Sequence, residues 1–302
     1  MRRSATLSIL LVFCLWTGLA GAQSGPIAPI SFVYRLKIAG CAFAPTARRQ
    51  TGFRVQGIAG IVTALHGVAD CTTFSAVTDE GKVFTELVIT AVDVAHDVVL
   101  LSSQELDELT IDGFVVSPLA PDELLGATVE IVGYPLGLDK QDIDSIERVR
   151  DIEALDHIIP DTEETPAFVD RHSPQFDIPV LNLQAQLLPG HSGAPLLDQQ
   201  GQVIGVGNGG LRGGTVNRSW AIPWRDIQWQ SATTEAMQKE LERLAHTDPG
   251  FALSFSSTYP IIIQPSEQQK SFTGRVINSY QEPVEGAEVT LSLENGYQVD
   301  YT

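Results

Sequence analysis

The sequence predicts an all-β fold. Short apolar runs recur along the chain and are bounded by turn residues such as glycine, proline and aspartate. Strands of this length and spacing are typical of a β-barrel or a β-sandwich. The expected strands, in chain order, are Ile30–Ala39, Gly52–Val55, Ile58–Ala64, Thr73–Val77, Val83–Val92, Val98–Ser102, Thr128–Val132, Val180–Leu187, Ala194–Asp198, Gln202–Val206 and Ser219–Ile222.

The N-terminal residues have the pattern of a secretory signal peptide. Arg2 and Arg3 precede an apolar run from Leu7 to Leu19, and small residues at 20–22 supply an A-x-A cleavage site. The run is too short for a membrane-spanning helix of about 20 residues. No other hydrophobic segment of the sequence is long enough to span a membrane. We therefore expect residues 1–22 to be removed, the mature chain to be periplasmic or secreted, and no membrane span.

Two cysteines remain after the signal, Cys41 and Cys71. They flank the apolar run that leads to His66. An even pair in an exported chain indicates a disulfide, because the compartment is oxidising. Two buried free thiols are the alternative.

Two polar side chains stand at the ends of apolar runs in the first half of the chain. His66 follows the run GIVTAL, and Asp97 directly precedes Val98–Leu101. Taken alone, such a histidine is more often a packed structural residue. The aspartate is either a turn residue or a buried carboxylate that needs a partner, because an unpaired buried charge is costly.

The segment LLPGHSGAPLL at Leu187–Leu197 places Ser192 between glycines at the start of an apolar run. Glycine tolerates positive φ and lets the backbone approach a ligand closely. Two backbone N–H groups can then point at one oxygen, as an oxyanion hole requires. A glycine turn with a serine is also an ordinary loop, and it is the order His66, Asp97, Ser192 that favours chemistry.

Together these stretches resemble the trypsin-like serine peptidases, in particular their short bacterial, periplasmic-protease-like branch. The resemblance covers roughly residues 30 to 225. It is carried by Thr51-Gly52-Phe53, GIVTALHGV around His66, HDVVLL around Asp97, VEIVGYPLG at Val129–Gly137 and LPGHSGAPLLDQQGQVIGV at Leu188–Val206.

The resemblance implies two six-stranded antiparallel β-barrels, at about 30–116 and 126–225, with the active site in the cleft between them. The peptidase domain would span 23–250. Met237, Leu241 and Leu244 recur at helical spacing in the segment 232–245. We expect a helix there, packed behind the second barrel. The resemblance also supports a disulfide between Cys41 and Cys71.

The resemblance further implies a role for each site residue. Ser192 would be the nucleophile, His66 the general base and acid, and Asp97 the carboxylate that orients the imidazole. The backbone N–H groups of Gly190 and Ser192 would form the oxyanion hole. Asp93 competes for the third role, but the family pattern places that carboxylate directly before the apolar run. His96, between the two, is expected to be a solvated loop residue.

For the primary substrate pocket the resemblance points to four neutral residues. A pocket without a carboxylate favours uncharged P1 side chains of small to medium size. The glycines suit a plain turn equally well. The four residues are Gln186, Asn208, Gly209 and Gly210.

Three positions depart from the family pattern. His191 precedes the nucleophile where vertebrate digestive relatives carry an aspartate, and a histidine cannot be the anionic partner of a new amino terminus. Activation by such an ion pair is therefore not expected. Leu65 and Ala194 replace smaller residues, which leaves an inactive homologue as an alternative.

Two further segments stand apart from the barrels. Acidic residues concentrate at Asp139–Asp170, where we expect a solvated loop with a short helix around Ile146–Leu155. Residues 251–270 are expected to form a linker. Residues 271–302 resemble the start of a carboxypeptidase-regulatory-like β-sandwich, and only about three strands fit there, whereas a sandwich needs around seven.

Composition narrows the choice of function. The chain has 19 Lys+Arg and 37 Asp+Glu, a net charge of −18, which argues against nucleic-acid partners and anionic membrane surfaces. No phosphate-binding glycine loop, zinc-ligand cluster or PDZ signature is visible, so no cofactor or metal is expected. The sequence predicts an exported serine endopeptidase that hydrolyses polypeptides through a Ser-His-Asp triad and an acyl-enzyme. The alternative is a catalytically inactive trypsin-like fold that serves as a binding or adaptor module.

Overall fold

The computed structural model describes most of the expected peptidase domain and a small part of the C-terminal segment. The described residues are 31–108, 112–139, 141–146, 148–159, 172–185, 187–210, 219–247, 289–292 and 298–301. The expected signal peptide and linker lie outside them.

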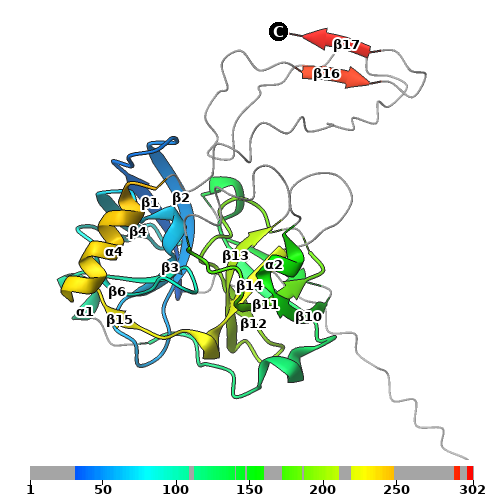
Figure 1. Ribbon diagram of the computed structural model, residues 1–302, viewed down its shortest axis with the longest axis horizontal. Coiled ribbons are helices and arrows are strands. Elements are labelled where there is room, and N and C mark those ends of the chain that lie inside the picture. The colour runs from blue at the N-terminus through cyan, green and yellow to red at the C-terminus, as the bar shows by residue number, and fades with distance from the viewer. Residues whose placement is uncertain are drawn as a thin grey trace, which may run out of the picture.

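The strands β1 to β7 from the first half of the chain and β15 from near its C-terminal end form one antiparallel sheet of eight strands, in the order β15-β6-β7-β3-β2-β1-β4-β5. Figure 1 shows the strands of this sheet that come from the first half of the chain in blue and cyan, beside the green and yellow second sheet. The strands are β1 (Val33–Ala39), β2 (Ala47–Phe53), β3 (Ile61–Ala64), β4 (Thr73–Val77), β5 (Val83–Phe84), β6 (Val88–Asp93), β7 (Val98–Ser102) and β15 (Gln230–Ser231).

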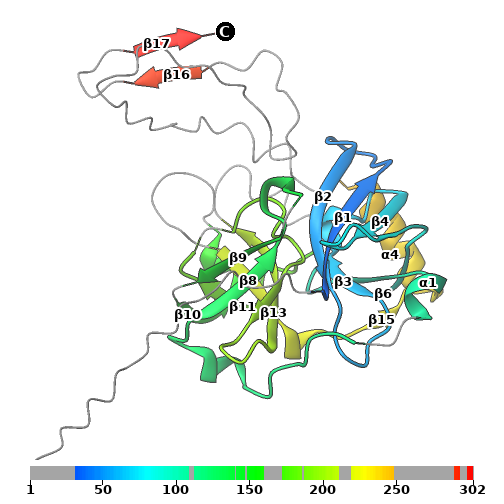
Figure 2. The same cartoon turned by 180° about the vertical axis from the view of Figure 1, so that it is seen from behind.

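The second sheet has seven antiparallel strands, in the order β10-β11-β14-β13-β12-β8-β9. The same side-by-side arrangement of the two sheets is seen from behind in Figure 2. The strands are β8 (Val129–Gly133), β9 (Asp142–Ile146), β10 (Val149–Ala154), β11 (Pro179–Leu183), β12 (Pro195–Leu197), β13 (Val203–Gly210) and β14 (Ser219–Pro223).

Strand β7 explains how the two sheets share a core. Its residues Val98 and Leu100 pack in the cluster between the sheets, and Val99 and Leu101 pack in the cluster of the first sheet. Successive side chains of a strand point to opposite faces, so a strand buried on both faces is apolar throughout. This double burial accounts for the four apolar residues in a row.

Strand numbers differ from the expected six in each barrel. In the first sheet, six consecutive strands of the ladder are extended at one edge by β5 and at the other by β15, each two residues long. The second sheet gains β9 and β10 at its edges. We expected the acidic segment Asp139–Asp170 to be a loop with a helix around Ile146–Leu155, but its described residues form β9 and β10, followed by the short helix α2 (Leu155–Ile158). Edge strands pair on one side only and accept charged residues, which is why acidity was a poor guide there.

Helix α4 (Glu235–Ala245) lies within the segment where we expected a helix, but it covers the other sheet. It begins after Thr234, whose side chain accepts a hydrogen bond from the Met237 N–H as an N-cap. Met237 and Leu244 pack in the core cluster of the first sheet, and α4 lies beside β1 and β4 in Figure 1. The expected packing behind the second barrel is wrong, because β15 pairs with β6 and returns the chain to the first sheet.

The shorter helical elements lie in the connections between strands. They are η1 (Leu65–Gly67), α1 (Gln104–Asp107), η2 (Pro121–Leu124), η3 (Pro135–Gly137), α2 (Leu155–Ile158) and η4 (Trp224–Asp226). Across the described parts of the chain, no helix combines the length and the apolar character needed to cross a membrane.

In the C-terminal segment, β16 (Val289–Ser292) and β17 (Gln298–Tyr301) form an antiparallel pair. The rest of the expected β-sandwich module lies outside the described residues.

Candidate active site

His66 and Asp97 meet because of the register of two paired strands. Ala64 at the end of β3 pairs with Val98 at the start of β7. His66, two residues after β3, and Asp97, one residue before β7, therefore lie at the same end of the ladder. His66 Nδ1 hydrogen-bonds Asp97 Oδ2, and the Leu65 N–H donates to the Asp97 carbonyl over 2.9 Å.

Ser192 reaches this pair from the second sheet. Its Oγ lies 3.0 Å from His66 Nε2, so the structure brings together the three residues that the sequence singled out. The serine sits in a tight turn between Gly190 (φ 99°) and Gly193 (φ 78°). A Cβ on Gly193 would lie 2.2 Å from Thr63 Oγ1 and 2.4 Å from the Thr51 carbonyl oxygen, which shows why this turn requires glycine.

Thr51, on β2, holds that turn against the first sheet. Its N–H donates to the Ser192 carbonyl over 3.1 Å, and its hydroxyl donates to the Gly190 carbonyl over 2.7 Å. Thr51 is fully buried. The sequence motif Thr51-Gly52-Phe53 marked this position without indicating its contacts.

The peptide groups around Ser192 have fixed orientations. The Pro189 carbonyl accepts from the Leu136 N–H over 2.5 Å, and the His191 carbonyl accepts from the Ala194 N–H over 2.9 Å. In a planar trans peptide the N–H points away from its carbonyl, so the N–H groups of Gly190 and Ser192 point away from these contacts. Within the described part of the chain, neither N–H donates a hydrogen bond.

Asp97 lies in a buried polar environment. The residue is fully buried and has φ 55°, in the left-handed region. Besides His66, its carboxylate accepts from Asn208 Nδ2 over 2.8 Å and from the Ser173 hydroxyl over 3.2 Å. Both donors come from the second half of the chain.

Asn208, which we expected at the substrate pocket, lies in an irregular part of β13 with its side chain directed at Asp97. The pairing of β13 with β14 shifts between Gly207 and Gly209, so Asn208 is the extra residue of a β-bulge. Its buried amide faces Asp97 and accepts from Trp220 Nε1 over 2.9 Å. The side chain therefore belongs to the environment of Asp97.

The remaining pocket expectations have different outcomes. Gly209 and Gly210 end strand β13, and a Cβ on Gly209 would lie 2.3 Å from the Trp220 ring. Gln186 lies outside the described residues.

Asp93, the competing carboxylate, has other partners. It accepts from the His96 ring over 2.7 Å and from the Gln228 N–H over 2.6 Å. Burial alone would raise the pKa of Asp93, but these hydrogen bonds hold that pKa below its usual value. His96 is not the solvated residue we expected, because its side chain is only 11% exposed and pairs with Asp93.

His191 is fully buried behind the nucleophile turn. Its Nδ1 accepts from the Leu188 N–H over 3.3 Å. Burial lowers the pKa of His191 to about 4, opposed by the charge of Asp142. The side chain is neutral at pH 7 and does not serve as an anionic partner, as its residue type led us to expect.

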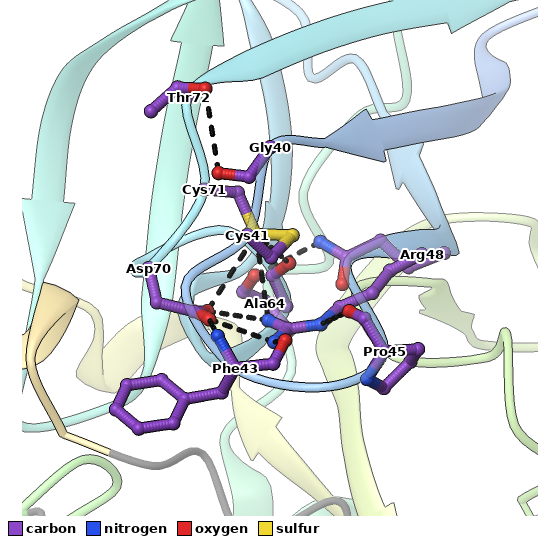
Figure 3. A network of polar contacts seen from close by, with 11 residues as sticks. Gly40, Cys41, Phe43, Pro45, Arg48, Ala64, Asp70, Cys71 and Thr72 are labelled. Carbon is purple, nitrogen blue, oxygen red and sulfur yellow. Dashed lines mark hydrogen bonds and ion pairs between the residues drawn. A yellow bond between two sulfur atoms is a disulfide. The ribbon is translucent and has the colours of Figure 1, made fainter.

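The predicted disulfide between Cys41 and Cys71 is present. Figure 3 shows it beside a buried ion pair, in which Arg48 contacts both carboxylate oxygens of Asp70, at 2.5 and 2.8 Å. Asp70 also accepts from the Phe43 N–H over 3.1 Å. Cys41, Asp70 and Cys71 are close enough to hold a metal ion, but the two sulfur atoms are bonded to each other.

Comparisons with known proteins identify the domain. A family profile described as "Trypsin-like peptidase domain" matches residues 50–206, just over half of the 302-residue chain, and spans His66, Asp97 and Ser192. The comparison with curated proteins gave no significant match.

Several solved structures are similar. The active form of the Rv3671c protease from M. tuberculosis has 22% identity and a TM-score of 0.51, over 65% of this chain and 78% of that chain. An inactive mutant form of Rv3671c has 21% identity and a TM-score of 0.49, over 72% and 89%. A serine endoprotease from Yersinia pestis has 16% identity and a TM-score of 0.47, over 71% and 64%.

At such low identity the first of these structures supports the fold alone. It agrees with two mainly antiparallel sheets that meet at Ser192 and His66. The family itself follows from the profile match across the site, and the chain belongs to the trypsin-like peptidase domain family.

Proposed function

We propose that this protein is an exported serine endopeptidase that hydrolyses polypeptides. The observation that carries the proposal is the continuous set of contacts from Asp97 through His66 to Ser192. A serine hydroxyl is a poor nucleophile unless a base lies within hydrogen-bond reach. His66 Nε2 is within that reach, at 3.0 Å.

In the proposed reaction, His66 takes the Ser192 proton as Oγ attacks the scissile carbonyl carbon. The resulting tetrahedral intermediate collapses when His66 returns the proton to the amide nitrogen of the leaving peptide, and an acyl-enzyme remains. A water molecule then repeats the sequence and releases the acid product. Asp97 orients the imidazole and stabilises its charged form throughout.

The N–H groups of Gly190 and Ser192 would stabilise the oxyanion of that intermediate. This assignment is supported by the fixed Pro189 and His191 carbonyls, which leave each N–H group pointing away from its own carbonyl contact. Preorganised donors of this kind typically contribute about 3 kcal/mol each to transition-state stabilisation.

Export is supported by the signal-like residues 1–22 and by the disulfide Cys41–Cys71. Disulfides persist in oxidising compartments and are rare in the cytosol. The mature protein purified from its host should begin at Gln23. An intact leader on the purified protein would contradict export by this route.

Labelling with a fluorophosphonate probe tests the proposed nucleophile. Wild type should be labelled at neutral pH, and Ser192→Ala should not. Ser117→Ala is a matched control, because Ser117 is a buried serine on the connection between the sheets, outside the site. A peptide blocked at both ends should be cut internally, as an endopeptidase requires. Absence of labelling in folded wild type would instead favour the non-catalytic binding module.

A further inference from the structure

The turn between β6 and β7 belongs to the first sheet, but side chains and backbone from the second half of the chain hold it. The Gln228 N–H donates to Asp93 Oδ2, and the Gln175 N–H donates to the Ala95 carbonyl over 2.8 Å. Ser173 donates to Asp97 itself. The turn that presents the Asp97 carboxylate is thus secured from outside its own sheet.

The two oxygens of the Asp97 carboxylate have different partners. Oδ2 accepts from both His66 and Asn208, and Oδ1 accepts from the Ser173 hydroxyl over 3.2 Å. The last torsion of an aspartate is soft, because it joins an sp³ to an sp² carbon. The Ser173 hydroxyl holds the oxygen opposite to the one that His66 contacts, and a donor there resists rotation of the carboxylate plane.

Ser173 is suited to fix that plane. It is 1% exposed, and its hydroxyl can donate one proton only, which it directs to Asp97 Oδ1. Its neighbour Gln175 is tied to the same turn through Ala95. The segment 172–178 is therefore held to the β6–β7 turn by a side-chain contact and a backbone contact.

We propose that Ser173 is a positioning residue for the reaction, in that its hydroxyl fixes the plane in which Asp97 meets His66. This inference rests on the proposed function. If Ser173 positions Asp97, the reactivity of Ser192 depends on the segment 172–178, which precedes β11 and lies far from Asp97 in sequence.

The experiment compares Ser173→Ala with Ser117→Ala, which removes another buried serine hydroxyl away from the site. We expect Ser173→Ala to lower kcat about tenfold, the size of effect for one hydrogen bond to a charged group, with KM within about twofold of wild type. Ser173→Thr retains the hydroxyl and should restore most of the rate. The fluorophosphonate labelling rate should follow kcat.

A measurement on the resting protein separates positioning from stability. The low-field proton resonance of the His66 Nδ1–H should shift in Ser173→Ala and stay unchanged in Ser117→Ala. If the alanine variant does not fold, Ser173→Cys is used instead, because a cysteine side chain has nearly the shape of serine and its thiol is a weaker hydrogen-bond donor. This variant is expected to shift the resonance in the same way.

An unchanged resonance together with a wild-type kcat in folded Ser173→Ala or Ser173→Cys would overturn the inference while leaving the proposed function intact. Failure of wild type to label would overturn the proposed function, whereas the resonance would still report whether Ser173 orients Asp97.

Discussion

The indole N–H of Trp220 donates to Asn208 Oδ1 over 2.9 Å, and this contact fixes the orientation of the Asn208 side-chain amide. An indole nitrogen can only donate, so the amide oxygen faces Trp220 and the amide NH₂ faces Asp97. The bulge in β13 makes the geometry possible, because it leaves Asn208 outside the regular pairing with β14. Trp220 therefore acts on Asp97 through Asn208.

The variant Asn208→Asp tests this arrangement. It replaces the donor with a carboxylate that faces Asp97 Oδ2, now 2.8 Å from the amide nitrogen. Two carboxylates this close do not both ionise at neutral pH, and a proton held on Asp97 Oδ2 removes the acceptor that orients His66 Nδ1. We expect fluorophosphonate labelling at pH 7 to slow by about 100-fold or more, as small misplacements of catalytic groups can do.

Asn182→Asp is the matched control. Asn182 is also a fully buried asparagine whose amide nitrogen contacts a carboxylate, that of Glu153 over 2.5 Å. This variant should lower the free energy of unfolding by a similar amount without slowing labelling. Wild-type labelling by Asn208→Asp, or equal slowing in both variants, would contradict the prediction.

Asn208 also shows which part of the site could not be predicted from sequence. The pairing of His66 with Asp97 was predicted through the resemblance to the trypsin-like serine peptidases, and the register of β3 and β7 accounts for it. A β-bulge leaves no comparable pattern. Asn208 was therefore assigned to a pocket wall, and Ser173, in a segment without periodicity, was not singled out at all.

The same limit applies to the fold. The amphipathic pattern around Met237 and Leu244 predicted a helix, but a pattern does not say which sheet the helix covers. That depends on the two-residue strand β15, too short to recognise in the sequence. In β9 and β10, charge was taken for a loop signal, although an edge strand tolerates it.

Gly193→Ala should disrupt the nucleophile turn. A left-handed φ costs a residue with a Cβ about 1–2 kcal/mol, and here the new carbon would also overlap Thr63 Oγ1 and the Thr51 carbonyl. We expect urea unfolding to show a loss of more than about 3 kcal/mol, and labelling of Ser192 to be largely lost.

Gly201→Ala separates the two contributions. Gly201 has a similar φ of 71°, but a Cβ there would meet nothing within 4 Å. This variant should lose only the conformational contribution, about 1–2 kcal/mol, and keep full labelling. If the two variants are equally destabilised, close contact at Gly193 is not the cause.

Arg48→Met should be strongly destabilising. Arg48 and Asp70 are 3% and 5% exposed, and removing the guanidinium leaves the Asp70 carboxylate buried without its main partner. Breaking a buried pair in this way costs about 3–5 kcal/mol. Adding Asp70→Asn removes the charge and keeps an acceptor for the Phe43 N–H. Urea unfolding should therefore find the double variant more stable than Arg48→Met alone. A double variant that is less stable would show that the ion pair is not the dominant contact.

His191 should make the protein less stable in mild acid. Burial lowers its pKa to about 4 in the folded protein, whereas an unfolded histidine has a pKa of about 6.5. Between these values the unfolded chain binds the extra proton, so stability falls as pH falls from about 6.5 to about 4 and changes no further below that. At pH 4.5 the loss from this one group is about 2–3 kcal/mol.

His191→Asn isolates that contribution, because the asparagine oxygen can accept from the Leu188 N–H in place of Nδ1 and does not titrate in this range. Urea unfolding at pH 7 and at pH 4.5 should show a smaller acid loss in the variant than in wild type. Asp93 and Glu240, whose pKa values are also lowered, contribute equally to both proteins and cancel in the comparison. An identical acid loss in the two proteins would mean that His191 takes up its proton in the folded state as readily as in the unfolded one, and that burial does not hold it neutral.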